Sequence, residues 1–281
     1  MSFILVLALA LATSGTSPAE IAWSLDPSWD DGRAEVAHYE ARRTVYGVAR
    51  SFDTVILTVK EEMDTRVGVK ADPPLEGRPL VTVLKTNIIS SIPAGNYTYH
   101  YMTSVFAQRN DPLTLLKLSH SSQEWCGTTF KEVVAWDGPG RLVRHSYFDG
   151  QGDGETPLRL GRDVLLEEQL FIAVRGMRPP EGGELAFDLY DTLVTHTAST
   201  PQARPVRART AGSGPLDTPA GSFRARRIDL RQAEASPKDP PLMTFWVEEA
   251  PRSALLAFEA ADGRSLRLAS IERRDYWSAL K

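Results

Sequence analysis

Apolar and polar residues alternate along most of the chain from Glu35 onward. Tyr39, Ala41 and Val45 share one phase of this alternation, and the pattern resumes over 54–60, 80–89 and 185–195. Alternation with a period of two is typical of half-buried strands. The breaks carry turn residues, as in Pro93-Ala94-Gly95-Asn96. We therefore expect a mainly β fold of the α+β class, built from large curved antiparallel sheets in a half-barrel arrangement.

One stretch follows the period of a helix instead. Apolar residues recur at helical spacing after Asp163, at Leu166, Leu170, Ala173, Val174 and Met177. Asp163 can cap the segment 164–175, and Gly176 can close it. The pattern predicts one buried helix at about 163–177, lying across the open side of a sheet. Glu167 and Glu168 fall near its amino end, where the helix dipole favours carboxylates.

The amino terminus predicts export. Phe3–Ala12 is an unbroken apolar run followed by small polar residues. Ten residues are too few to cross a bilayer but suit the core of a signal peptide, although no Lys or Arg precedes them. A buried strand is the alternative. We expect a signal peptide over 1–19, a β region over 20–160, a helix and connector over 161–180, and a second β region over 181–281. The two β regions can form one continuous domain.

Composition limits the partners. The net charge is −4 and the isoelectric point is about 5.8, so nothing favours a nucleic-acid partner. No later segment is long and apolar enough for a membrane helix, so we do not expect an integral membrane protein. Exported proteins lie in the periplasm or outside the cell, where disulfides form, but the single cysteine, Cys126, has no internal partner.

The sharpest chemical constellation surrounds that cysteine. If Leu113–His120 and Cys126–Trp136 form a hairpin around a loop at 121–125, His120 lies opposite Cys126. The pair could then form a thiolate nucleophile, with Glu124 orienting the histidine. The alternative is a small buried thiol beside a hydrogen-bonded histidine. We expect the second, structural arrangement.

A set of aromatic and apolar residues suggests a binding surface. Tyr97, Tyr99 and Tyr101 share one face of a strand and could form a ligand platform, although such faces are more often ordinary sheet surface. An apolar ligand held between this sheet and the helix would contact residues from both. The candidate ligand-binding residues are Tyr97, Tyr99, Tyr101, Trp125, Leu166, Leu170 and Phe171.

Metal and cofactor motifs are absent from the sequence. The acidic, glycine-rich stretch 149–155 lacks the third and twelfth ligands of a calcium loop, so we interpret it as a solvated connection. The patterns HExxH, GxSxG and GxGxxG do not occur. We therefore predict neither a metal nor a cofactor.

Two details of strand pairing can be predicted in the last third. A three-residue loop at 261–263 pairs Phe258 with Leu266 and gives Gly263 the left-handed position. Phe223 and Ala225 are out of phase with Ile228 and Leu230, and a β-bulge near 226–227 would restore the phase.

Short patches resemble known sequences. Met102–Phe106, Ser121–Gly127 and Ser146–Phe148 look like a group of uncharacterised exported bacterial β-rich proteins with no assigned activity. Thr218–Arg224, followed by Phe245–Val247, resembles a second uncharacterised periplasmic β domain. The resemblance implies export and a β fold. It carries over no catalytic residue, because none is established for these proteins.

Taken together, the sequence favours an exported, non-catalytic cell-envelope protein that binds an apolar or lipid-like ligand between helix and sheet. A structural envelope protein that binds a protein partner is the first alternative. A thiol-dependent hydrolase using Cys126 is the second.

Overall fold

The computed structural model describes residues 22–236, 238–249 and 252–278, and the expected signal peptide lies outside them. Most of this part of the chain is strand, as expected. The strands are β1 Ala34–Val45, β2 Val48–Asp64, β3 Val69–Lys70, β4 Leu80–Pro93, β5 Thr98–Gln108, β6 Asp111–Glu124, β7 Gly127–Val134, β8 Arg141–Ser146, β9 Gly154–Pro157, β10 Val164–Leu166, β11 Leu185–Tyr190, β12 Ala203–Thr218, β13 Gly221–Gln232, β14 Met243–Glu248, β15 Leu255–Ala260 and β16 Ser265–Arg274.

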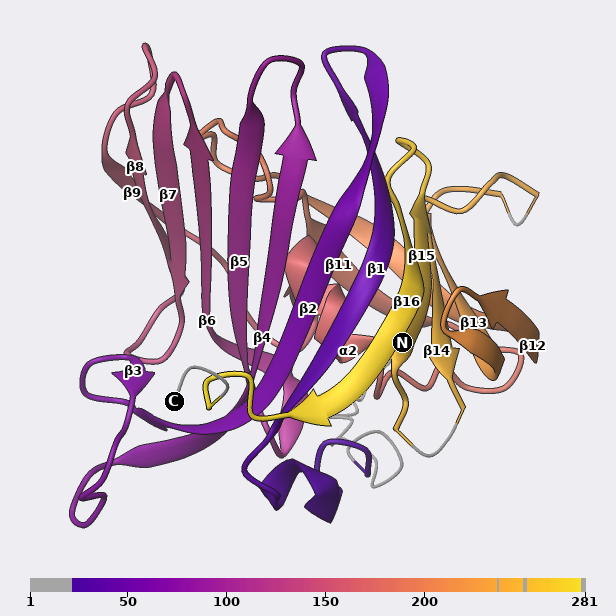
Figure 1. The fold of residues 1–281 in the computed structure, drawn as a ribbon, viewed down its shortest axis with the longest axis horizontal. Helices are drawn as coiled ribbons and strands as arrows, with labels where there is room; N and C mark the ends of the chain where they lie inside the picture. The colour runs from indigo at the N-terminus through magenta and orange to yellow at the C-terminus, as the bar shows by residue number, and fades with distance from the viewer. Residues whose placement is uncertain (1–21, 237, 250–251, 279–281) are drawn as a thin grey trace, which may run out of the picture.

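All sixteen described strands belong to one curved sheet that does not close into a barrel (Figure 1). Its path runs β10-β11-β12-β13-β14-β15-β16-β1-β2-β4-β5-β6-β7-β8-β9, with β3 attached to β2. The junction is β1, which pairs with β16 on one side and β2 on the other. Ala41, for example, lies between Leu266 and Phe52. The first and last strands of the described chain are thus neighbours in the middle of the sheet.

The predicted helix is wrong in extent. Val164–Leu166 is strand β10, followed by a 3-10 turn η2 at Glu167–Gln169 and a single helical turn α2 at Leu170–Ala173. Strand β10 pairs in parallel with β11, so the sheet takes up its backbone hydrogen bonds. Asp163 does not act as a helix cap; its carbonyl oxygen accepts a hydrogen bond of 2.8 Å from the Asp188 N–H.

The prediction that this segment is buried is nevertheless correct, and it lies inside the curve of the sheet (Figure 1). No helix in the described part of the chain has the length and apolar character needed to span a bilayer.

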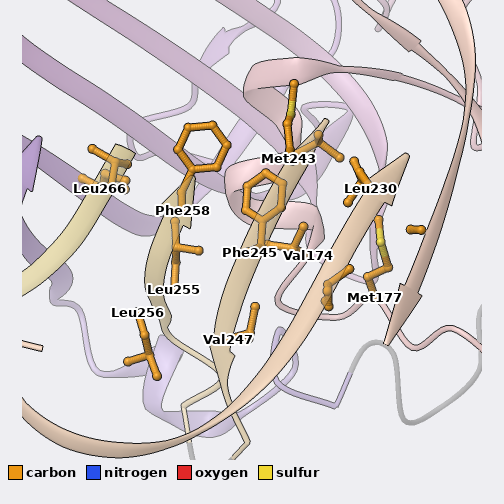
Figure 2. Packing of buried hydrophobic residues seen from close by; sticks show 14 of the residues in the cluster. Val174, Met177, Leu230, Met243, Phe245, Val247, Leu255, Leu256, Phe258 and Leu266 are labelled. Atoms are coloured by element: carbon orange, nitrogen blue, oxygen red, sulfur yellow. The ribbon is translucent and has the colours of Figure 1, made fainter. Parts of the chain in front are cut away.

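Two main cores cover the two faces of the buried segment 164–177, which we call the internal segment. Leu170, Val174 and Met177 pack against β11–β16, and Figure 2 shows Val174 beside Phe245 and Met177 beside Leu230. Leu166 and Ile172 instead join a core with Leu84, Val105, Leu118 and Leu142 under the amino-terminal strands. The apolar repeat seen in the sequence thus serves two opposite walls rather than one stripe.

The structure confirms the register predicted for the last hairpin. Phe258 pairs with Leu266, and Gly263 has φ +87° in the three-residue loop between Ala260 and Arg264. The predicted bulge lies on the neighbouring strand: the register shifts between Thr210 and Gly212 of β12, opposite Arg227 and Ile228. The extra residue is Ala211 of β12, so the prediction of a bulge at 226–227 is wrong: β13 pairs with β14 from Ala225 to Leu230 without a register shift.

Candidate functional site

A small apolar cavity lies between the internal segment and the sheet. We call residues Glu167–Phe171 the 167–171 turn. Phe171 from this turn faces side chains of β1, β2, β4, β15 and β16 across a cavity of about 80 Å³. Its apolar walls are Phe52, Ile88, Ile92, Phe171, Phe258 and Leu266.

Phe171 holds its place through aromatic contacts. Its ring centroid lies 5.1 Å from that of Phe258 and 5.9 Å from that of Phe245, at tilted and edge-on angles. These arrangements suit the quadrupoles of the rings. Phe245 is fully buried, whereas Phe171 is only half-buried because one side of it faces the cavity. The rings therefore form a fixed floor for the cavity.

Two buried carboxyl groups also line the cavity. Glu167 is 3% exposed and forms an ion pair with Arg264. Glu168 is 1% exposed, and its Oε1 accepts hydrogen bonds from the Thr192 hydroxyl and from the Leu193 N–H at 2.9 Å. Burial, and then the charge of Glu167, raise the pKa of Glu168 above its ordinary value.

The other oxygen of Glu168 is unpaired. Its Oε2 is buried without a hydrogen-bond partner among the described residues. A protonated Glu168 would carry its hydrogen on this oxygen, because Oε1 already accepts two hydrogen bonds. Because Oε2 has almost no accessible surface, this hydrogen would lie behind the cavity wall and not within reach of the cavity.

A third wall comes from the connection between β11 and β12, which we call the 191–198 segment. Thr192 and Val194 of this segment line the cavity. The Arg43 guanidinium donates a hydrogen bond of 2.7 Å to the Val194 carbonyl oxygen and lies over the Tyr101 ring. Burial lowers the pKa of Arg43. The segment is thus fixed to the sheet at the cavity.

A buried lysine fixes the same segment from the other side. The Lys131 side chain on β7 is 1% exposed, and its Nζ donates to the carbonyl oxygens of Leu193, Thr195 and Thr197 and to the Thr195 hydroxyl, at 2.6–3.0 Å. Burial lowers the pKa of Lys131 to about 8, an effect that Glu168 opposes. With every proton of the ammonium directed at an oxygen, the group is a structural anchor and not a free nucleophile.

The predicted Cys126–His120 pair does not exist. Strands β6 and β7 are joined by a two-residue turn, so Glu124 pairs with Gly127, and His120 lies opposite Lys131. Cys126 is exposed on that turn. This also corrects our expectation of a buried thiol, because the tighter turn moves Cys126 out of the sheet.

The other two candidate catalytic residues are buried apart from the thiol. His120 is fully buried, its Nδ1 lies 2.9 Å from the Thr103 hydroxyl, and burial lowers its pKa to about 3. Glu124 has a side chain only 4% exposed, and burial raises its pKa; its Oε1 lies 3.9 Å from His196 Nδ1. No base–nucleophile pair involving Cys126 results.

The three tyrosines do share one face, as predicted. We call Tyr97, Tyr99 and Tyr101 the tyrosine ladder: successive ring centroids lie 5.4 and 5.7 Å apart. Tyr99 and Tyr101 are buried in a cluster with Ile92 and with the half-buried Val194, and both of these residues line the cavity. The ladder stands beside the cavity and does not line it.

Of the other predicted ligand-binding residues, only Phe171 lines the cavity. Leu166 and Leu170 are buried in the cores, and Trp125 is 79% exposed on the β6–β7 turn. Sequence reasoning missed Arg43, Arg264 and Lys131 and assigned Glu168 to a helix end. One signal was present: Lys131 lies in phase with Thr129 and Val133, at an inward position of its strand.

Metal ligands do not gather in the described part of the chain, where no group of three or more His, Cys, Asp or Glu side chains could hold an ion. The stretch 149–155 forms a loop and the start of β9, with Asp153 3.2 Å from His145.

Comparisons with known proteins give a fold-level likeness only. A scan against protein-family models and a search of curated proteins find no match. A search of solved structures finds a β-barrel-like protein of domain of unknown function DUF1849 from Brucella abortus. The alignment has 8% sequence identity and a TM-score of 0.47, and it covers 86% of this chain and 98% of the other.

Proposed function

We propose that this protein is an exported, non-catalytic component of the cell envelope that holds the apolar end of a lipid-like compound between the 167–171 turn and the sheet. The observation that carries the proposal is the cavity floored by Phe171 and walled by Ile88, Ile92 and Phe258. Fully packed interiors rarely leave space larger than a water molecule. Export rests on the apolar run Phe3–Ala12.

The cavity defines the chemical class of the ligand. Pockets for drug-sized ligands span roughly 300–1,000 Å³, whereas this cavity is about 80 Å³. It therefore accepts the end of a chain or a small apolar group, with the remainder of the compound outside.

The alternative functions fare differently. A thiol-dependent hydrolase would need a base beside Cys126. His120 cannot serve, because it lies opposite Lys131 while Cys126 is exposed on the turn. A structural protein that binds a protein partner is the competing function, and the well-filled cores of the two walls favour it. The contents of the cavity distinguish the two.

Filling the cavity tests the proposal. Ala41 is 2% exposed and lines the cavity, so Ala41→Leu places three more carbon atoms where the ligand would lie. Organic extraction of gently purified wild-type protein should release a lipid-like compound, and extraction of Ala41→Leu should not. Val194→Phe fills the same space from the 191–198 segment and serves if the first variant unfolds.

The matched control is Ala186→Leu, which adds the same atoms at an exposed position of β11. It should keep the compound at the wild-type level. Wild-type protein without any extractable compound, or equal amounts from all variants, would favour the structural function instead.

A further inference from the structure

Four turns at one end of the sheet carry aromatic residues. Because β1, β2 and β4–β9 run antiparallel in succession, the turns after β1, β4, β6 and β8 lie at the same end, the upper edge of Figure 1. Each of these turns holds one of four residues: Tyr46, Tyr97, Trp125 and Tyr147. We call these four residues the aromatic rim.

The rim is exposed and continuous. Tyr46, Trp125 and Tyr147 are 71%, 79% and 77% exposed. The Trp125 ring stacks on that of Tyr97, with centroids 5.8 Å apart, and the Tyr97 hydroxyl lies 3.5 Å from that of Tyr46. Tyr147 covers Gly127, where a Cβ atom would lie only 2.7 Å from the tyrosine ring. Singly exposed aromatic residues are ordinary, but a row on four adjacent turns is not.

The opposite end of the sheet has a different character. Its described connections, 65–79, 109–110 and 135–140, hold Arg66, Arg78, Arg109 and Asp137 in ion pairs. Their single aromatic residue, Trp136, packs against Gly68. The four aromatic turns, by contrast, contain no Lys or Arg, and Asp149 and Asp153 are their only charged residues. Exposed apolar side chains also occur at the opposite end, at Val67, Val69 and Trp277, so the two ends differ in their charged residues.

We propose that the aromatic rim docks the open end of the sheet onto the interface of a lipid bilayer with neutral, zwitterionic headgroups. Trp and Tyr favour that interface because each has an apolar ring and a polar atom. The four turns contain no basic residue, so they lack the usual attraction to anionic lipids. A row of rings across four neighbouring turn tips also suits a surface that yields around the rings, whereas a protein partner would need a groove matched to the whole row.

The position of the rim gives docking a consequence. Trp125 and Tyr97 lead into the tyrosine ladder, and Tyr99 packs with Ile92, which lines the cavity. A docked bilayer would thus meet the end of the sheet from which aromatic contacts continue to the cavity. Docking itself does not require the cavity to hold a ligand.

The single cysteine provides the reporter. Cys126 is exposed beside Trp125, so an NBD fluorophore attached to it reports the polarity around the tip of that turn. On titration with phosphatidylcholine vesicles we expect the emission to shift to the blue and to intensify. The effect should persist in about 0.5 M salt, where electrostatic attraction is screened over a few ångströms, and anionic lipid should not enhance it.

Two substitutions on the rim test the side chains. Trp125→Ser and Tyr147→Ser together should weaken binding at least about tenfold, because they remove two ring surfaces from the interface. Trp277→Ser, which removes a tryptophan 46% exposed outside the rim, should leave binding unchanged. All proteins compared have the same amino terminus, so an affinity of Phe3–Ala12 for lipid cannot create the difference.

The contrary outcomes are specific. An unchanged NBD spectrum at saturating vesicles would overturn the proposal, as would binding that requires anionic lipid or disappears at high salt. A wild-type affinity of the Trp125→Ser/Tyr147→Ser protein would also overturn it. Ala41→Leu should dock normally, so failure of the ligand proposal and failure of docking can be told apart.

Discussion

The Lys131 ammonium donates a hydrogen bond of 2.6 Å to the carbonyl oxygen of Leu193, and so ties β7 to the wall of the cavity. The same wall supplies the Leu193 N–H to Glu168 and the Val194 carbonyl oxygen to Arg43. The 191–198 segment therefore accepts hydrogen bonds from two cationic side chains, Lys131 and Arg43, and donates one to the buried carboxyl group of Glu168. Its position depends on charges that lie inside the sheet.

We predict that Lys131→Met destabilises the fold by about 3 kcal/mol, because it leaves several buried acceptors of the 191–198 segment without a donor. Denaturant unfolding at neutral pH measures this change. Lys70→Met, which removes an exposed ammonium paired with Asp72, should have little effect. Equal stabilities of the two variants would show that the buried lysine does not anchor the segment.

Glu168→Gln should change how stability depends on pH. A pKa raised by burial means that the folded state holds its proton more tightly than the unfolded state does. The stabilisation is complete below the unfolded pKa of about 4.5 and is lost as pH rises through the folded pKa. Wild type should therefore lose stability relative to Glu168→Gln as pH rises above about 4.5, because glutamine keeps the acceptor and cannot ionise.

Parallel unfolding curves of these two proteins at pH 4 and pH 8 would contradict this prediction. Glu168→Ala provides the control for shape, since it deletes the acceptor of the Thr192 and Leu193 hydrogen bonds and should destabilise at both pH values.

A buried ion pair anchors the end of the internal segment. Arg175 is 3% exposed, pairs with Glu35 at 2.7 Å, and lies over the rings of Trp23 and Trp29. Glu35→Gln should cost about 3 kcal/mol in the free energy of unfolding, because it leaves a buried guanidinium without its counter-charge. Thermal or denaturant unfolding checks this value.

The matched control is Glu272→Gln, in a pair with Arg274 whose side chains are about half exposed. No measurable change is expected there. A Glu35→Gln protein as stable as this control would show that Arg175 is satisfied by the Arg252 and Ser253 carbonyl oxygens alone.

Cys126 should react with a thiol reagent at neutral pH almost as fast in the folded protein as in denaturant, because it is exposed on the β6–β7 turn. Cys126→Ala should leave unfolding unchanged for the same reason. Strong protection in the folded state would return Cys126 to the buried position expected from the sequence and would contradict the two-residue turn.

The sequence predicted strands well where one face is buried and the other is solvated, because alternation reports that arrangement directly. A glycine at a left-handed position, Gly263, also made the loop length and register of the last hairpin predictable. At 121–127 the same alternation fits several loop lengths. With the predicted five-residue loop His120 would lie opposite Cys126, whereas with the observed two-residue turn it lies opposite Lys131. Local pattern does not decide between such registers.

The internal segment shows a second limit. Apolar spacing of three and four residues indicates burial but not a helix, because Leu166 and Leu170 face different cores from a strand and a short turn. The pairing of β10 with β11 depends on residues more than twenty positions away. The cavity likewise combines β1, β2, β4, β15, β16 and the 191–198 segment, and no local pattern brings these together.

The most direct test of the account locates the ligand in the intact protein. In methyl-labelled protein purified with its bound compound, we predict nuclear Overhauser effects from the compound to the methyl groups of Ile88 and Ile92, which line the cavity. None should reach Ile172 or Ile228, which are buried in the cores and do not line the cavity. Contacts at Ile172 or Ile228 without any at Ile88 and Ile92, or no contact to any isoleucine methyl, would contradict a ligand held between the 167–171 turn and the sheet.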